Sequence, residues 1–235
     1  METALYLIPV TLGGSDVKAV LPDSNHDIIM GIKFFIVENI RSARRFLKLV
    51  DKSVDIDSLT FYELNEHTDP RDITEYLNPL KEGNSMGIIS EAGCPAIADP
   101  GSLVVAMAQK KNLRVIPLVG PSSIILSLMA SGFNGQNFAF NGYLSAKPAE
   151  RKTKLHQLEN KIWKENQTQI FIEAPYRNMQ MMESILSTCR GDTKLCIATA
   201  LTCPDEYIHT HTVSEWKKIS HRDIQKIPTI FLLYK

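Results

Sequence analysis

Residues 90–101, SEAGCPAIADPG, connect a predicted strand to a predicted helix. The apolar run 85–89 predicts a short buried strand, and the apolar positions of 103–111 predict a helix. A strand-to-helix connection usually needs about two to six residues, whereas this one is long and rich in glycine, proline and alanine. The segment fits a stiff turn in which Asp99 is the N-cap and Pro100 begins the helix. It also fits a loop whose backbone closely approaches a ligand.

Strands and helices alternate outward from this loop. Predicted strands of the first half lie at 4–10, 34–37, 86–90 and 113–119, and predicted helices at 39–50, 69–80, 103–111 and 121–131. The second half gives strands at 138–140, 170–172, 195–201, 207–213 and 229–234, and helices at 155–162 and 179–186. This alternation predicts an α/β fold with a mainly parallel sheet in the first half and an antiparallel portion at the end. We expect two α/β domains, 1–117 and 118–235, with a ligand cleft between them.

Composition excludes several classes of protein. The chain has 235 residues, with 26 Lys plus Arg against 26 Asp plus Glu, so no overall basic field indicates a nucleic-acid partner. No apolar run approaches the ~20 residues of a membrane span. The four cysteines form no CxxC pair and have no histidine at zinc spacing. We therefore expect free thiols, a cytoplasmic location, no metal and no membrane association.

Two further turns favour the ligand interpretation of 90–101. Residues 117–123 (PLVGPSS) again pass from a strand through a sharp turn to a helix start, and 172–177 (IEAPYR) follow a strand of the second half. Neither a GxxxxGK[ST] nor a GxGxxG motif is present, which disfavours nucleotide hydrolysis and a Rossmann dinucleotide site. A small ligand that contacts several strand ends remains the better hypothesis.

These motifs together resemble the tetrapyrrole methylase superfamily, in the branch that methylates a ribose 2′-hydroxyl of small-subunit ribosomal RNA. SEAGCPAIADPG is similar to that branch's S-D-A-G-T-P-x-I-S-D-P-G. The resemblance continues, in order and with approximate spacing, over nearly the whole chain. It includes Glu38-Asn39-Ile40-Arg41, Glu66-His67, Gly120-Pro121-Ser122-Ser123, Gly142-Tyr143-Leu144, Glu150-Arg151 and Glu173-Ala174-Pro175-Tyr176-Arg177. The segments 8–16 and 199–203 depart from the usual sequences of this branch, and longer relatives extend beyond the position of Lys235.

The resemblance implies a homodimeric methyltransferase that binds S-adenosylmethionine between its two domains. The implied cofactor-binding residues are Pro9, Ser90, Glu91, Gly93, Cys94, Ile97, Ala98, Ser122, Ser123, Glu173, Ala174, Pro175 and Leu201. A ribose hydroxyl needs a base or an orienting group in reach, and the candidate catalytic residues are Glu38, Arg41, Glu66 and His67. Arg41 and Arg177 are candidates for holding an anionic group of the substrate.

The methyl acceptor has three competing hypotheses. The first is ribosomal RNA on the small subunit, which a basic surface of Lys147, Arg151, Lys152 and Lys154 would favour. The second is a tetrapyrrole or another non-RNA acceptor, which would need basic groups for its carboxylates. The third is a binding protein that keeps the cofactor pocket without catalysis. A solvated helix face is the alternative interpretation of the four cationic residues.

Overall fold

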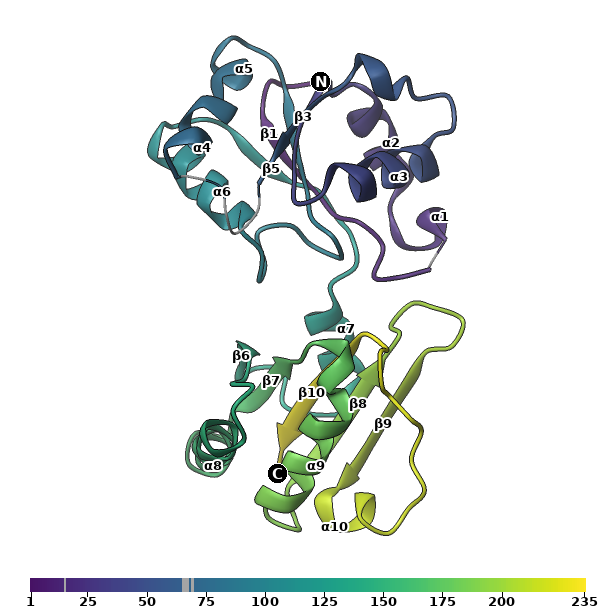
Figure 1. The fold of residues 1–235 in the computed structure, drawn as a ribbon, viewed down its shortest axis with the longest axis vertical. Coiled ribbons are helices and arrows are strands. Elements are labelled where there is room, and N and C mark those ends of the chain that lie inside the picture. The colour runs from purple at the N-terminus through teal and green to yellow at the C-terminus, as the bar shows by residue number, and fades with distance from the viewer. Residues whose placement is uncertain (15, 65–67, 69) are drawn as a thin grey trace. The chain divides into compact units, whose positions relative to one another are not determined.

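The computed structural model describes residues 1–14, 16–64, 68 and 70–235. The chain divides into two units, Met1–Ser122 and Ser123–Lys235. Figure 1 draws both units, and each is described by itself below. Among the described residues, no helix combines the length and apolarity that crossing a bilayer requires.

The first unit is built on a five-stranded parallel sheet with the order β3-β2-β4-β1-β5. Its strands are β1 (Leu5–Ile8), β2 (Phe34–Val37), β3 (Thr60–Glu63), β4 (Met86–Ile89) and β5 (Val115–Pro117). β4 is buried along its whole length, as expected when helices cover both faces of a parallel sheet. Because all five strands run in one direction, the loops that follow them leave from the same edge of the sheet.

Helices cover both faces of the first sheet (Figure 1). They are α1 (Val17–Val20), α2 (Asp23–Met30), α3 (Ile40–Val50), α4 (Pro70–Tyr76), α5 (Asn78–Lys81) and α6 (Gly101–Lys110), with a 3-10 helix η1 (Ile56–Ser58). α2 and α3 enclose one apolar cluster with Phe35 and Phe46. α4, α5 and α6 enclose the other with Leu77 and Val104.

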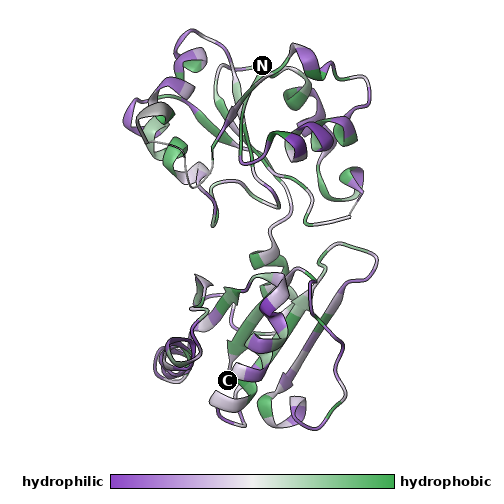
Figure 2. Cartoon of the chain, in the orientation of Figure 1, coloured by the Kyte–Doolittle hydropathy of each residue, from purple (hydrophilic) through white to green (hydrophobic). Residues whose placement is uncertain are grey.

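The second unit has a mixed five-stranded sheet with the order β6-β7-β10-β8-β9. Its strands are β6 (Phe138–Tyr143), β7 (Thr168–Ile172), β8 (Lys194–Thr199), β9 (Tyr207–Thr212) and β10 (Thr229–Tyr234). Only the β6–β7 pair within this sheet is parallel. Figure 2 shows the hydrophobic central strands of this unit, and β10 is an almost continuous apolar run.

The second sheet is also covered on both faces. Its helices are α7 (Ser123–Ser131), α8 (Pro148–Glu165), α9 (Asn178–Thr188) and α10 (Val213–Trp216), with a 3-10 helix η2 (Pro175–Arg177). α8, α9 and α10 pack around Phe171, Phe231 and Trp216. α7 packs on the opposite face, against Ile170 and Leu232.

The predicted α/β class and the antiparallel end of the chain are confirmed. The segments α1, α2, β3 and α10 were absent from the sequence-based prediction, and the single helix predicted at 69–80 is divided into α4 and α5. The helix predicted at 103–111 begins two residues earlier, at Gly101, and its N-cap is Pro100. Asp99 is not the N-cap, although its carboxylate accepts from the amide of Gly101.

Candidate functional site

Three loops leave the carboxyl ends of β1, β4 and β5 and are joined to one another. The amide of Val10 donates to the carbonyl of Gly93 at 2.9 Å. The thiol of Cys94 lies 3.4 Å from the carbonyl oxygen of Pro121. The amide of Leu118 donates to Leu7 at 2.9 Å. The two turns that the sequence indicated in the first unit, 90–101 and 117–123, are therefore joined to each other and to the loop that follows β1.

Two glycines allow these loops to approach so closely. Gly120 packs against the Pro9 ring, and a Cβ at residue 120 would overlap that ring. Gly93 has a φ of +69°, and a Cβ there would meet the side chain of Leu12 at 3.0 Å and the Pro121 carbonyl at 3.4 Å. The small residues are thus required by contacts within the protein, whatever ligand the surface binds.

The loop 90–101 is held in an unusual conformation by Asp99. Both carboxylate oxygens of Asp99 lie 2.9 Å from the amide of Ala96, and one of them accepts from Gly101 at 2.7 Å. Ala96 and Ala98 have positive φ angles of 68° and 60°. Residues other than glycine in this region are strained by about 1–3 kcal/mol each, and such strain is concentrated at functional sites.

Glu38 lies at the same edge of the first sheet. It directly follows β2, and β2 pairs with β4 so that Val37 lies beside Ile89. Its Oε1 accepts from the Glu91 amide at 3.4 Å. Burial raises the pKa of the Glu38 carboxyl, and the negative charge of Asp99 raises it further. Glu38 is therefore a better proton acceptor near neutral pH than an exposed glutamate.

The other predicted catalytic residues have different positions. Arg41 is exposed on the first turn of α3. Glu66 and His67 lie outside the described residues. Asp99 had no role in the sequence-based site, although Asp99 raises the pKa of Glu38 and fixes the loop. The signal that could have found it is its position just before Pro100 and Gly101, where a carboxylate faces free amides.

The predicted cofactor-binding residues of the first unit lie on the three joined loops. Pro9, Ser90 and Gly93 are buried, Cys94 and Ser122 are half-buried, and Glu91, Ile97 and Ala98 are exposed. Ile97 is 54% exposed, although an isoleucine side chain gains from burial. Its exposure leaves an apolar side chain on this loop accessible to a ligand.

The predicted cofactor-binding residues of the second unit lie on different segments. Ser123 begins α7, Glu173, Ala174 and Pro175 follow β7, and Leu201 lies in the turn after β8. Glu173 accepts from Arg177 Nη2 at 2.6 Å and from its neighbouring amide at 2.7 Å, both through Oε1. Its other oxygen, Oε2, is buried without a partner in the described part of the chain. A buried carboxylate oxygen of this kind can accept a hydrogen bond from a ligand.

The predicted cationic surface at the start of α8 needs a correction. Arg151 is only 4% exposed. Its Nε donates to Ser184 at 2.9 Å, and its Nη1 donates to the carbonyl of Ala146 at 3.2 Å. Arg151 lies four residues before the buried Leu155, and residues at that spacing share one helix face. The prediction that Arg151 contacts phosphate is therefore wrong, because its guanidinium joins α8 to α9.

Replacing Arg151 by alanine is expected to lower the free energy of unfolding by about 1–3 kcal/mol, because Ser184 and Ala146 lose their buried donor. Lys152→Ala, one residue further along and exposed, should change stability by less than about 0.5 kcal/mol. Urea unfolding followed by circular dichroism measures both. Equal stability of the two variants would contradict the structural role of Arg151.

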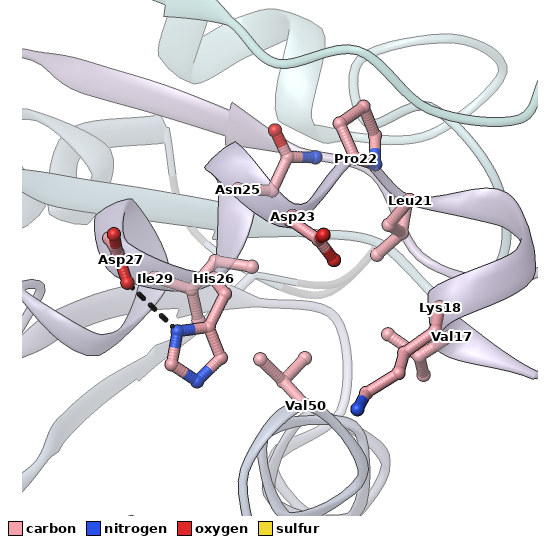
Figure 3. A pocket seen from close by; sticks show the side chains of 10 residues that line it. All are labelled: Val17, Lys18, Leu21, Pro22, Asp23, Asn25, His26, Asp27, Ile29 and Val50. Atoms are coloured by element: carbon pink, nitrogen blue, oxygen red, sulfur yellow. Dashed lines mark hydrogen bonds and ion pairs between the residues drawn. The ribbon is translucent and has the colours of Figure 1, made fainter.

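A separate pocket of about 340 Å³ lies in the first unit, among α1, α2 and α3 (Figure 3). Its lining includes Lys18, His26 and Val50. His26 lies 3.0 Å from Asp27 and 2.9 Å from Asp51. Hydrogen bonds to these two carboxylates raise the pKa of His26. Of the predicted catalytic and cofactor-binding residues that the structure describes, none lines this pocket.

Solved structures share this fold. The methyltransferase CobJ matches with a TM-score of 0.65 and 14% identity, covering 99% of this chain and 94% of that chain. The cobalt precorrin-4 methyltransferase CbiF matches with a TM-score of 0.61 and 13% identity, covering 99% of this chain and 95% of that chain. Diphthine synthase matches with a TM-score of 0.63 and 15% identity, covering 98% of this chain and 89% of that chain. The chain therefore has the fold of the tetrapyrrole methylases.

Curated relatives give the family. Ribosomal RNA small subunit methyltransferase I of Vibrio cholerae serotype O1 is 30% identical over 213 residues, which are 90% of this chain and 69% of the relative. The enzyme of the same name from Bacillus subtilis strain 168 is 28% identical over 214 residues, 90% of this chain and 68% of the relative. The chain belongs to the ribosomal RNA small subunit methyltransferase I family, which confirms the predicted branch and enzyme class. No family model matches the chain.

Proposed function

We propose that this protein transfers the methyl group of S-adenosylmethionine to a ribose 2′-hydroxyl of small-subunit ribosomal RNA. The observation that carries the proposal is the 30% identity over 213 residues to a ribosomal RNA small subunit methyltransferase. The chain covers 69% of that relative. The relatives' name supports RNA over a tetrapyrrole as the methyl acceptor.

The residues present fit the cofactor. S-adenosylmethionine supplies an electrophilic methyl group on a sulfonium centre. The three joined loops offer small side chains and backbone groups to a flat ligand, with Ile97 exposed beside them. In the second unit, the buried and unpartnered Oε2 of Glu173 is an acceptor suited to an amino or ammonium group. Pro9, Ser90, Glu91, Gly93, Cys94, Ile97, Ala98, Ser122, Ser123, Glu173, Ala174, Pro175 and Leu201 remain the proposed cofactor-binding residues.

Glu38 is the proposed proton acceptor. Methyl transfer to a hydroxyl forms an O–C bond, breaks an S–C bond and releases the hydroxyl proton. A carboxylate with a raised pKa at the edge of the site accepts that proton, and burial together with the charge of Asp99 keeps the pKa of Glu38 raised. We propose three further residues that orient the substrate. Arg41 follows β2 in sequence, and Glu66 and His67 follow β3.

The direct test uses small ribosomal subunits from a strain that lacks the gene. Incubation with purified protein and a labelled methyl donor is expected to label the RNA of these subunits, and nucleoside mass spectrometry should find a 2′-O-methyl nucleoside. Subunits from the parent strain, which already carry the methyl group, should stay unlabelled. Label in ribosomal protein, or none under conditions where the cofactor binds by calorimetry, would contradict the proposal.

We further propose a homodimer in the cytoplasm, on the family resemblance alone. Light scattering over a dilution series should give twice the mass of the 26.4 kDa chain. A monomer mass throughout the series would contradict this expectation.

A further inference from the structure

Two exposed tyrosines and one arginine lie at or just after the carboxyl ends of β6 and β7 in the second unit. These strands are parallel neighbours, and Tyr143 at the end of β6 lies beside Ile172 at the end of β7. Tyr176 and Arg177 follow in η2. Tyr143 is 61% exposed and Tyr176 is 59% exposed. Large aromatic side chains that stay exposed near one sheet edge are candidates for an interaction surface.

Arg177 is immobilised between Glu173 and Tyr176. Its Nε and Nη2 donate to Glu173 Oε1 at 3.0 and 2.6 Å, and its Nη1 donates to the Tyr176 hydroxyl at 2.8 Å. The guanidinium carbon lies 4.9 Å from the centre of the Tyr176 ring. A guanidinium has five N–H donors, so two of them remain available beyond these contacts with described residues. The side chain keeps 24% exposure, so solvent reaches it.

The backbone of this segment is fixed as well. The side chain of Gln225 donates to the carbonyl of Tyr176 at 2.5 Å. The amide of Lys226 donates to the carbonyl of Pro175 at 2.9 Å. The exposed Tyr176 ring is thus presented on an anchored backbone, and a ligand that stacks on it has little of this segment left to order.

Aromatic rings beside an arginine with free donors match the chemistry of an unpaired nucleotide. Bases that are not paired stack on tyrosine rings and arginine planes, and arginine also contacts phosphate. A base-paired helix offers its backbone and grooves, which exposed rings cannot use for stacking. The position of the cluster, directly after the proposed cofactor-binding residues Glu173, Ala174 and Pro175, adds a reason to connect it with the substrate.

We propose that Tyr143, Tyr176 and Arg177 form a stacking surface for an unpaired nucleotide of the RNA substrate, with Arg177 contacting a phosphate. This inference rests on the proposed function and deepens it, because it specifies single-stranded RNA as the form that is bound.

The second unit contains a matched control. Arg190 lies 4.6 Å from the centre of the Trp163 ring and pairs with Asp192 at 2.9 Å. Trp163 is 38% exposed. This pair has the same chemistry, but its arginine follows α9, whereas Arg177 precedes α9; Trp163 itself lies in α8. The 11 residues of α9 separate the two clusters by about 16 Å along the helix.

Binding of a labelled single-stranded RNA of about ten nucleotides is the first measurement. Tyr176→Ala is expected to weaken this binding by about 5- to 150-fold, since stacking of one base has that effect. Tyr176→Phe should retain most of the affinity, and Trp163→Ala should leave it unchanged. Arg177→Gln should lower the log–log salt slope by about 0.7. The same RNA annealed to its complement should bind more weakly than the single strand, and Tyr176→Ala should not change the affinity for this duplex.

Methylation of small subunits is the second measurement. Tyr143→Ala and Tyr176→Ala are expected to raise KM for the subunits, while calorimetry finds unchanged affinity for S-adenosylmethionine. The stacking surface is refuted if both variants bind single-stranded RNA with an affinity within about twofold of the wild type. It is also refuted if the variants lose affinity for S-adenosylmethionine to the same extent as they lose affinity for RNA. If the wild type methylates no RNA, the proposed function fails, which is a separate result from the loss of Tyr176-dependent RNA binding. Circular dichroism checks that each variant is folded.

Discussion

Glu38→Gln is expected to lower kcat for methylation of small subunits by about 10²- to 10⁴-fold, the usual contribution of a positioned general base. The amide keeps an oxygen that can accept from the Glu91 backbone, as Oε1 does at 3.4 Å, so the loop should retain its structure. The exposed Glu82 gives the matched control, and Glu82→Gln should have the wild-type rate.

The pH dependence gives this prediction a second readout. The pKa of Glu38 is raised by burial and by Asp99, and a protonated carboxyl cannot accept a proton. Below the raised pKa the wild-type kcat/KM should therefore fall, and this acidic limb should lie above the pH at which an ordinary glutamate titrates. Glu38→Gln should abolish the limb. A normal rate with an unchanged acidic limb would exclude Glu38 as the base.

Trp216→Ala is expected to lower the free energy of unfolding of the second unit by about 3–5 kcal/mol, the range for truncation of a buried tryptophan. Trp216 is 1% exposed, and its indole N–H donates to the carbonyl of Leu195 at 2.9 Å. Its ring also meets His211 edge-on, with centroids 5.0 Å apart. Removal of the indole leaves a cavity beneath β8 and takes away one donor to the Leu195 carbonyl.

The chain has two tryptophans, so the second provides the control. Trp163→Ala removes a ring that is 38% exposed and should cost less than Trp216→Ala, because it buries less apolar area and its cation–π contact contributes only about 1 kcal/mol or less. Urea unfolding followed by circular dichroism compares the two variants. A loss below about 1 kcal/mol for Trp216→Ala would show that the unit repacks around the missing ring.

Buried strands could be predicted from the sequence because their apolar runs are short and uninterrupted. Phe34–Val37 and Ile170–Phe171 are such runs, and β2 has the predicted bounds. α2 (Asp23–Met30) could not be predicted, because only Asn25 and Ile29 are buried in it and no apolar stripe results. β3 lies at the edge of its sheet with exposed or half-exposed residues, so its sequence lacks a clear alternation.

The candidate site could be predicted only in part. The turns around Gly93 and Gly120 were visible because close backbone contacts require small residues. The pKa of Glu38 depends on burial and on Asp99, which lies 61 residues away in sequence, and no local pattern encodes that pairing. The burial of Arg151 did leave a signal, since Arg151, Leu155, Leu158 and Ile162 follow the spacing of one helix face. Its charge hid this signal, because an arginine is rarely buried.

The Asp99 carboxylate has a thermodynamic consequence for ligand binding. By accepting from both Ala96 and Gly101, it closes residues 96–101 into a small ring that forms as the chain folds. Fixing a flexible backbone costs about 1–2 kcal/mol per residue in conformational entropy. A loop of this kind loses that entropy during folding, before any ligand arrives. Binding at this surface should therefore show a smaller entropic penalty than binding that must first order its loop, and the loop's amide protons should already exchange slowly in the free protein.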